Sequence, residues 1–310
     1  MRKITFALGV LTMLIVVGCT QETGPSTATP FIGGSIGLLI DFVEQAPPPE
    51  VFDGGDFAFD VEVDLKNVGE TFVEKGDVTV QIIGIDPAEF STTASALKKS
   101  PEEDLDPTKK DPDGAIIEGT ETFVAFPDLN HEEELSGNTP FTFRANVCYK
   151  YQTVANAMMC IKEDLLDTSD TSVCIVNEDK TAFNSGAPVA VTSFKEQASG
   201  RDKVSFLFTV EHIGSGDVFK IGQDCDDTVR ANENRVLVNV DSGISGLSCS
   251  GLSDGTATSG YVTLYSGRRV VRCTQELADR TDYEKPVVIT LDYDYEEFVE
   301  KGVLVKHVST

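Results

Sequence analysis

The sequence has no tryptophan, only three histidines, and far fewer basic than acidic side chains, with 25 Lys and Arg against 51 Asp and Glu. The formal charge of −26 argues against binding to nucleic acid or anionic lipid, because an acidic surface repels both. The histidines show no His-Glu-x-x-His spacing, and none of the seven cysteines falls in a Cys-x-x-Cys pair. These absences disfavour zinc catalysis, structural zinc and thioredoxin-like redox chemistry, so we expect no cofactor.

The residues that are abundant suit a turn-rich β protein. The chain has 18 Phe, 7 Tyr, 26 Gly and 13 Pro, and 40% of its residues are hydrophobic. Aromatic residues at this level argue against general disorder. A chain of 310 residues is long enough for roughly two domains of ~150 residues, each with its own core.

The first eighteen residues predict a signal peptide, residues 1–18. Two basic residues precede an uncharged apolar stretch over residues 4–18, which is shorter than the ~20 residues that span a bilayer. The stretch ends in Val-Val-Gly before Cys19 and so resembles the lipobox of prokaryotic lipoproteins. The resemblance implies that Cys19 is lipidated and becomes the mature N-terminus, with ordinary signal cleavage beside an incidental cysteine as the alternative. Cleavage would leave a charge of 23 − 51 = −28.

Residues 19–32 follow as a polar, proline-containing tether. Six cysteines remain in the exported chain and predict three disulfides. Cys148 and Cys160 lie symmetrically about Val154, so we expect them to face one another across a hairpin of residues 141–151 and 157–163. The other four cysteines allow three pairings, of which we favour Cys249 with Cys273 and Cys174 with Cys225.

Alternating strand patterns occur twice in the chain. Residues 57–65 and 204–211 alternate apolar and polar side chains, and each run ends in a turn that contains glycine. Phe-Val-Glu-Gln-Ala at 42–46 matches Phe-Lys-Glu-Gln-Ala at 194–198, at an offset of 194 − 42 = 152. Cys-Tyr-Lys-Tyr at 148–151 matches Asp-Tyr-Asp-Tyr at 292–295, at an offset of 295 − 151 = 144. Ordered matches at nearly one offset predict a duplicated unit.

The duplication predicts two domains, residues 33–165 and 187–310, joined by a polar linker over 166–186. Strands separated by Gly, Pro, Asn and Asp turns predict an all-β fold of two tandem antiparallel immunoglobulin-like β-sandwiches. Each copy is expected to end in a long hairpin, the second one formed by residues 287–295 and 299–308. Residues 86–119 are an acidic insertion, in which we expect a short helix over 87–99 and otherwise a surface loop.

The run from Phe57 to Gly69 ends in Leu-Lys-Asn-Val-Gly and resembles the strand and turn of CARDB-like and related immunoglobulin-type modules of secreted prokaryotic proteins. The likeness covers about one strand pair per domain, and the second copy has His212 in place of the asparagine. The order of lipobox, tether and two such domains is similar to that of surface lipoproteins of prokaryotes, archaea in particular. The resemblance implies a spacer or adhesive role.

Candidate sites for chemistry are weak. Gly-Leu-Ser-Asp-Gly at 251–255 matches the nucleophile elbow of hydrolases in form, but a strand near Tyr261 follows where a hydrolase has a helix. The acidic residues between Asp292 and Glu297 alternate with tyrosines, and we expect them to face outward. Two carboxylate clusters are weak calcium candidates, because carboxylates are ligands that calcium prefers, although a solvated acidic surface is the simpler interpretation. They are Asp53 with Asp56, and Asp224 with Asp226 and Asp227.

These patterns favour a non-catalytic protein that is lipid-anchored on the extracellular face of the cell membrane and has a structural, adhesive or ligand-display role. Its partners would be the membrane, through the N-terminal lipid, and other cell-surface proteins or glycans. One alternative is a solute- or glycan-binding lipoprotein, which needs an aromatic-lined concavity. A secreted hydrolase is the less favoured alternative.

Overall fold

The computed structural model describes residues 29–308, apart from 168, 170, 279 and 280. Within these residues the chain is mostly β-strand with one short 3-10 helix, η1 (Lys75–Asp77), so the all-β prediction is confirmed. The described strands pair antiparallel except for β2 (Glu50–Phe52), which runs parallel to the end of β19 (Tyr283–Lys306).

Two of the sheets correspond to the two sequence repeats. The first has the strand order β1 (Leu38–Phe42), β3 (Phe59–Asn67), β8 (Glu121–Leu129). The second has the order β10 (Glu178–Lys180), β12 (Val189–Ala198), β13 (Lys203–His212), β18 (Arg268–Glu276), β16 (Leu247–Ser250). The alternating runs form β3 and β13, as predicted, and each lies between equivalent neighbours, β1 and β8 in one sheet and β12 and β18 in the other.

A third sheet runs through both halves of the molecule. Its order is β17 (Ser259–Thr263), β15 (Arg235–Asp241), β19, β9 (Thr139–Ile161), β4 (Val78–Ile83), β5 (Lys98–Lys99). In addition, β11 (Phe183–Asn184) pairs with β9, and β14 (Asp217–Phe219) pairs with β19. At one end Phe143 of β9 packs edge-on against Phe59 of β3, with ring centroids 6.0 Å apart. At the other end the Thr153 hydroxyl of β9 donates to the Val189 carbonyl of β12 at 2.6 Å.

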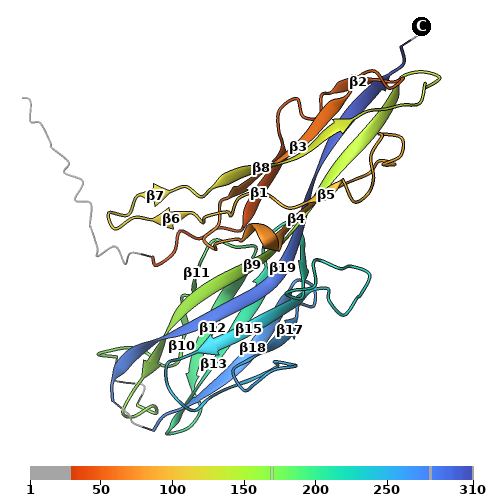
Figure 1. The fold of residues 1–310 in the computed structure, drawn as a ribbon. Helices are drawn as coiled ribbons and strands as arrows, with labels where there is room; N and C mark the ends of the chain where they lie inside the picture. The colour runs from red at the N-terminus through yellow and green to blue at the C-terminus, as the bar shows by residue number, and fades with distance from the viewer. Residues whose placement is uncertain (1–28, 168, 170, 279–280, 309–310) are drawn as a thin grey trace, which may run out of the picture.

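Strands β9 and β19 show that the expected hairpins are wrong. They have 23 and 24 residues, and they pair with each other from Tyr283 opposite Ile161 to Val305 opposite Thr139. The segment predicted as the turn of the first hairpin contains no glycine or proline, and its β-branched Thr153 and Val154 favour extended backbone. Both strands therefore begin in one half of the molecule and end in the other, as Figure 1 shows for the green β9 and the blue β19.

Four buried tyrosines mark the joint between the halves: Tyr149 and Tyr151 on β9, and Tyr293 and Tyr295 on β19. Tyr149 lies opposite Tyr295 and Tyr151 opposite Tyr293, so the matching Tyr-x-Tyr motifs of the repeat face one another. Their hydroxyls bind segments that cross the joint. Tyr149 accepts the Leu38 amide, Tyr151 accepts the Thr71 amide and donates to the Gly186 carbonyl, and Tyr295 accepts the Gly216 amide.

Each of the two repeat turns contains a glycine at a position where a larger side chain would not fit. A Cβ on Gly69 would overlap the Tyr151 hydroxyl, and a Cβ on Gly214 would overlap the Tyr295 hydroxyl. The Gly69 amide donates to the Gly37 carbonyl at 3.0 Å, and the Gly214 amide donates to the Pro188 carbonyl at 3.0 Å. The turn and the Tyr-x-Tyr motif therefore form one contact that occurs once in each half.

The insertion at 86–119 differs from the expected helix and loop. Residues 86–97 form successive turns, such as Phe90 amide to Pro87 carbonyl, and Phe90, Leu97 and Leu105 are buried in the core. After these turns, β5 pairs with β4, and a two-stranded hairpin is formed by β6 (Lys109–Lys110) and β7 (Ile116–Ile117). The buried apolar side chains of Phe90, Leu97 and Leu105 explain why the first part of this charged segment is folded against the body.

Candidate functional site

A cleft of about 740 Å³ lies at the joint between the two halves. Its floor includes Lys150 and Gln152 from β9 and Asp292 from β19. One wall is the segment from Glu70 to Asp77 after β3, and the other includes Phe31 and the start of β6. Residues from distant parts of the sequence therefore meet here because β9 and β19 pair through the joint.

The floor residues alternate with the buried tyrosines, so their side chains point away from the core. Gln152 Nε2 donates to Asp292 Oδ1 at 2.6 Å, and Lys150 forms an ion pair with Asp77 of η1. The hydrogen bond that Lys150 donates to Asp77 raises the pKa of Lys150, and burial raises the pKa of Asp292. The floor thus presents an ammonium, an amide and a carboxylate in a half-buried row.

The two walls of the cleft are joined by hydrogen bonds from backbone amides to the Glu70 side chain. Its carboxylate accepts the amides of Ile32, Gly33 and Gly186 at 2.9, 2.9 and 2.7 Å. This fixes the segment that carries Phe31, which is partly exposed, while Phe72 on the opposite wall is 48% exposed. Two accessible aromatic rings beside hydrogen-bonding groups suit a neutral polar ligand.

The described residues of the cleft lining include hydroxyl groups but no imidazole or thiol to act beside them. Among the described residues that line it there is no histidine or cysteine, and the Ser185 hydroxyl accepts the Val154 amide. Neither Lys150 nor Gln152 was a candidate from sequence, and Asp292 was expected only to face outward. The one signal that could have found them is the Tyr-x-Tyr alternation, which places Lys150 and Asp292 on the face opposite the core.

All six cysteines of the described chain form disulfides, but two expected pairings are wrong. Cys148 joins Cys225, and Cys160 joins Cys174. Cys148 and Cys160 cannot meet because both lie on β9, twelve residues or about 40 Å apart along one strand. Cys249 and Cys273 pair across β16 and β18, as predicted. Three disulfides indicate an oxidising compartment; Cys19 lies outside the described residues.

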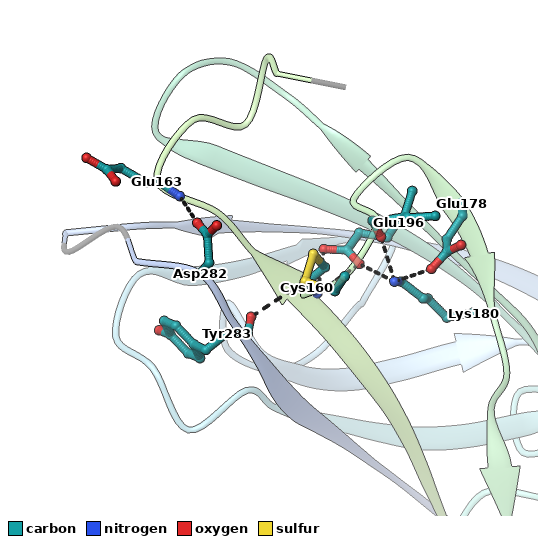
Figure 2. The surroundings of a disulfide bond; sticks show 9 residues. Cys160, Glu163, Glu178, Lys180, Glu196, Asp282 and Tyr283 are labelled. Atoms are coloured by element: carbon teal, nitrogen blue, oxygen red, sulfur yellow. Dashed lines mark hydrogen bonds and ion pairs between the residues drawn. A yellow bond between two sulfur atoms is a disulfide. The ribbon is translucent and has the colours of Figure 1, made fainter. Parts of the chain in front are cut away.

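Figure 2 shows a buried carboxylate beside the second disulfide. Both oxygens of Glu196 lie 3.0 Å from the Cys160 amide, and the Lys180 ammonium is 3.7 Å from Oε2. Lys180 also contacts Glu178 and donates to the Ile175 carbonyl. Burial raises the pKa of Glu196 to about 8 despite these partners. Glu196 is therefore a buried acid that holds the disulfide segment against β12.

The calcium candidates Asp224, Asp226 and Asp227 lie in the loop after β14. Asp224 and Asp227 line a pocket of about 250 Å³ together with Glu296, beside the Cys148–Cys225 bridge. Asp226 instead accepts the Thr228 amide and hydroxyl at 3.0 and 2.6 Å. No group of three or more His, Cys, Asp or Glu side chains in the described part of the chain is placed to hold a metal ion.

The other two calcium candidates, Asp53 and Asp56, differ in their exposure to solvent. Asp56 is exposed, whereas Asp53 is 3% exposed and accepts the amides of Leu135 and Val308 at 2.7 and 2.9 Å. The His307 ring also contacts Asp53 at 2.8 Å. These hydrogen bonds, led by the one from the Val308 amide, lower the pKa of Asp53 to about 2. Asp53 is therefore not part of a solvated surface; it fastens the residues that follow β19.

The expectation that residues 292–297 face outward holds only in part. Asp294 is 1% exposed and accepts the amides of Gly222, Gln223 and Asp224 at 3.0, 2.7 and 2.9 Å. The loop before Cys225 covers this carboxylate, and burial raises its pKa. Its role in the structure is to hold that loop on β19.

The elbow-like Ser253 forms an isolated antiparallel β-bridge with Tyr261 and does not lie between a strand and a helix. The Ser253 hydroxyl donates to the Tyr261 carbonyl at 3.1 Å. His212, which is half-buried, contacts the Tyr295 hydroxyl at 3.0 Å, and His131 Nδ1 contacts the Glu133 carbonyl. Among the described residues, Ser253 therefore has no hydrogen bond to a histidine.

Comparisons with known proteins leave the sequence resemblance as a prediction. No protein-family model matches the chain, and a search of curated protein sequences gives no match either. In the portion of the chain that the structure describes, no helix has the length and apolar character required to cross a membrane.

Proposed function

We propose that the mature protein is a lipid-anchored module on the extracellular face of the cell membrane, with a non-catalytic role in structure, adhesion or ligand display. The observation that carries this proposal is the uninterrupted pairing of β9 with β19 through both halves. Enzymes and binding proteins that close around a ligand bend at a few hinge residues between domains. A ladder of backbone hydrogen bonds through the joint opposes such bending and suits a rigid spacer.

We also propose that the two halves are immunoglobulin-like β-sandwiches. Each half has a central alternating strand with equivalent neighbours, and each sheet so formed faces one end of the shared sheet. Aligned sheets that pack over an apolar core are the basis of that architecture. A crystal structure with the two sheets of either half crossing at a right angle would contradict this assignment.

The anchor is supported by the apolar run that ends at Cys19 and by the three disulfides, which fit an exported chain. Cys19→Ser should release the protein into the medium or leave it as an unprocessed precursor. The matched control is Thr20→Ser, which should leave the protein in the membrane fraction. If the Cys19→Ser protein is processed and stays membrane-bound, lipid anchoring is wrong.

The cleft at the joint supports a second candidate function, glycan or solute binding. Phe31 and Phe72 can pack against the apolar face of a sugar while Gln152 and Asp292 bind its hydroxyls. Screening the protein on an array of oligosaccharides should then give binding that Phe72→Ala abolishes. Phe57→Ala is the control, because Phe57 is similarly exposed at 46% but lies outside the cleft. An array without binding would remove this candidate.

A further inference from the structure

The hairpin of β6 and β7, residues 108–118, projects from the body as a finger with an unusual surface. Ile116 and Ile117 are 58% and 55% exposed, more than any other large aliphatic side chain among the described residues. Lys109 lies opposite Ile117 and Lys110 opposite Ile116, so each face of the finger carries a lysine beside an isoleucine. Figure 1 shows the finger standing apart from the sheets, on the side where the described chain begins.

The finger is held in shape by its own turn. The Asp111 carboxylate accepts the amides of Asp113 and Ala115 at 3.0 and 2.7 Å, and the Asp111 amide donates to the Ala115 carbonyl at 2.9 Å. At the base, the Thr108 amide donates to the Gly69 carbonyl at 2.9 Å. The two isoleucines are therefore presented to solvent by an ordered hairpin.

The finger also contacts the start of the described chain. Lys110 Nζ donates to the carbonyls of Thr29 and Phe31 at 3.2 and 2.8 Å and contacts the Thr29 hydroxyl at 3.1 Å. Cys19 lies 29 − 19 = 10 residues before Thr29, and ten extended residues reach at most about 35 Å. A lipid on Cys19 would therefore keep the base of the finger within that distance of the bilayer.

We propose that the finger rests on the membrane by its β7 edge, so that Ile116 and Ile117, which point to opposite faces of the hairpin, both enter the interfacial region and Lys109 lies at the headgroup phosphates. This inference rests on the proposed lipid anchoring. Aliphatic side chains beside lysines suit a bilayer interface, because the lysine stem packs on apolar groups while its ammonium stays with polar headgroups. The mature charge of 23 − 51 = −28 opposes approach to a bilayer that carries net negative charge, so the contact depends on the anchor.

The absence of tryptophan makes the contact measurable at one position. In an Ile117→Trp variant all tryptophan fluorescence comes from the finger. The mature oxidised chain is coupled through the Cys19 thiol to a maleimide phospholipid in phosphatidylcholine vesicles, so that the test does not depend on native lipidation. We expect blue-shifted emission that brominated acyl chains quench, and Ile116→Ser in the same protein should reduce the quenching several-fold.

The matched control is Phe57→Trp, because Phe57 has similar exposure and its ring lies 4.9 Å from that of Phe52 on β2, a strand that Figure 1 shows away from the finger. Its emission should be neither shifted nor quenched. Equal quenching at the two positions, or none at the finger on vesicles that carry the protein, would overturn the finger contact and leave the anchor intact. Failure of the anchor itself is seen separately, in the fractionation of the Cys19→Ser protein.

Discussion

The bond between Cys148 and Cys225 offers a quantitative test of the fold, because it joins β9 to a loop that is distant in sequence. Disulfides stabilise chiefly by restricting the unfolded chain, and the effect grows with the length of the closed loop. Cys148 and Cys225 are 77 residues apart, whereas Cys160 and Cys174 are 14 apart. Loop-closure entropy then gives about 4.5 kcal/mol for the first bond and about 3 kcal/mol for the second.

The perturbation is Cys148→Ala with Cys225→Ala, compared with Cys160→Ala combined with Cys174→Ala. We expect the first pair to lower the free energy of unfolding more than the second, by about 1.5 kcal/mol. Equilibrium urea denaturation followed by circular dichroism measures both values. The amides that Asp294 accepts in the same loop persist in the first variant, so the folded loop should stay in place.

A single substitution tests the pairing itself. Cys148→Ala should leave one free thiol at Cys225, which alkylation and peptide mapping would locate. A free thiol at Cys160 would instead restore the pairing expected from sequence and refute the continuous β9. A larger loss of stability on removing the Cys160–Cys174 bond would refute the loop-entropy reasoning.

Gly69→Ala should lower the free energy of unfolding by more than about 2 kcal/mol, because its Cβ would overlap the Tyr151 hydroxyl; an unchanged urea midpoint would contradict that contact. Because the pKa of Glu196 is raised from 4.5 to about 8, the folded state binds this proton more tightly, and stability is lost as pH rises from about 4.5 to about 8. Glu196→Gln should therefore flatten the dependence of melting temperature on pH between 5 and 8, and a variant with the wild-type slope would disprove the assignment. Sodium chloride should raise the melting temperature gradually, and at matched ionic strength millimolar calcium should do no more than magnesium. A calcium-selective rise abolished by replacing the candidate aspartates would show a specific site; these are Asp53, Asp56, Asp224, Asp226 and Asp227.

The strands predicted correctly from sequence are those of ordinary length in which buried side chains alternate with more exposed ones. β3 shows this alternation over its nine residues and β13 shows it from Phe206 to Val210, which is enough to identify strands without knowing their neighbours. β9 and β19 were each predicted as a hairpin, because strands of more than twenty residues are rare and a hairpin divides the same segment into two strands of ordinary length. Their true partners are each other, across more than a hundred residues of sequence.

The site residues depend on contacts that local sequence does not encode. Glu44 and Glu196 occupy equivalent positions in the matched motifs, yet Glu44 is exposed and Glu196 is buried. The difference arises because the segment joined by Cys160 and Cys174 covers only the second copy. Likewise, the cleft combines Phe31, Lys150 and Asp292, which meet only after β9 and β19 have paired.

The continuous ladder through the joint can be tested directly by amide hydrogen exchange. If β9 and β19 form one rigid support for both halves, amides between Tyr149 and Thr153 and between Leu291 and Tyr295 should be as protected as those toward the strand ends in each half. Both sets should open together in the most stable cooperative unit. Rapid exchange confined to these central residues, with slow exchange on either side, would show a hinge and contradict the rigid-spacer account.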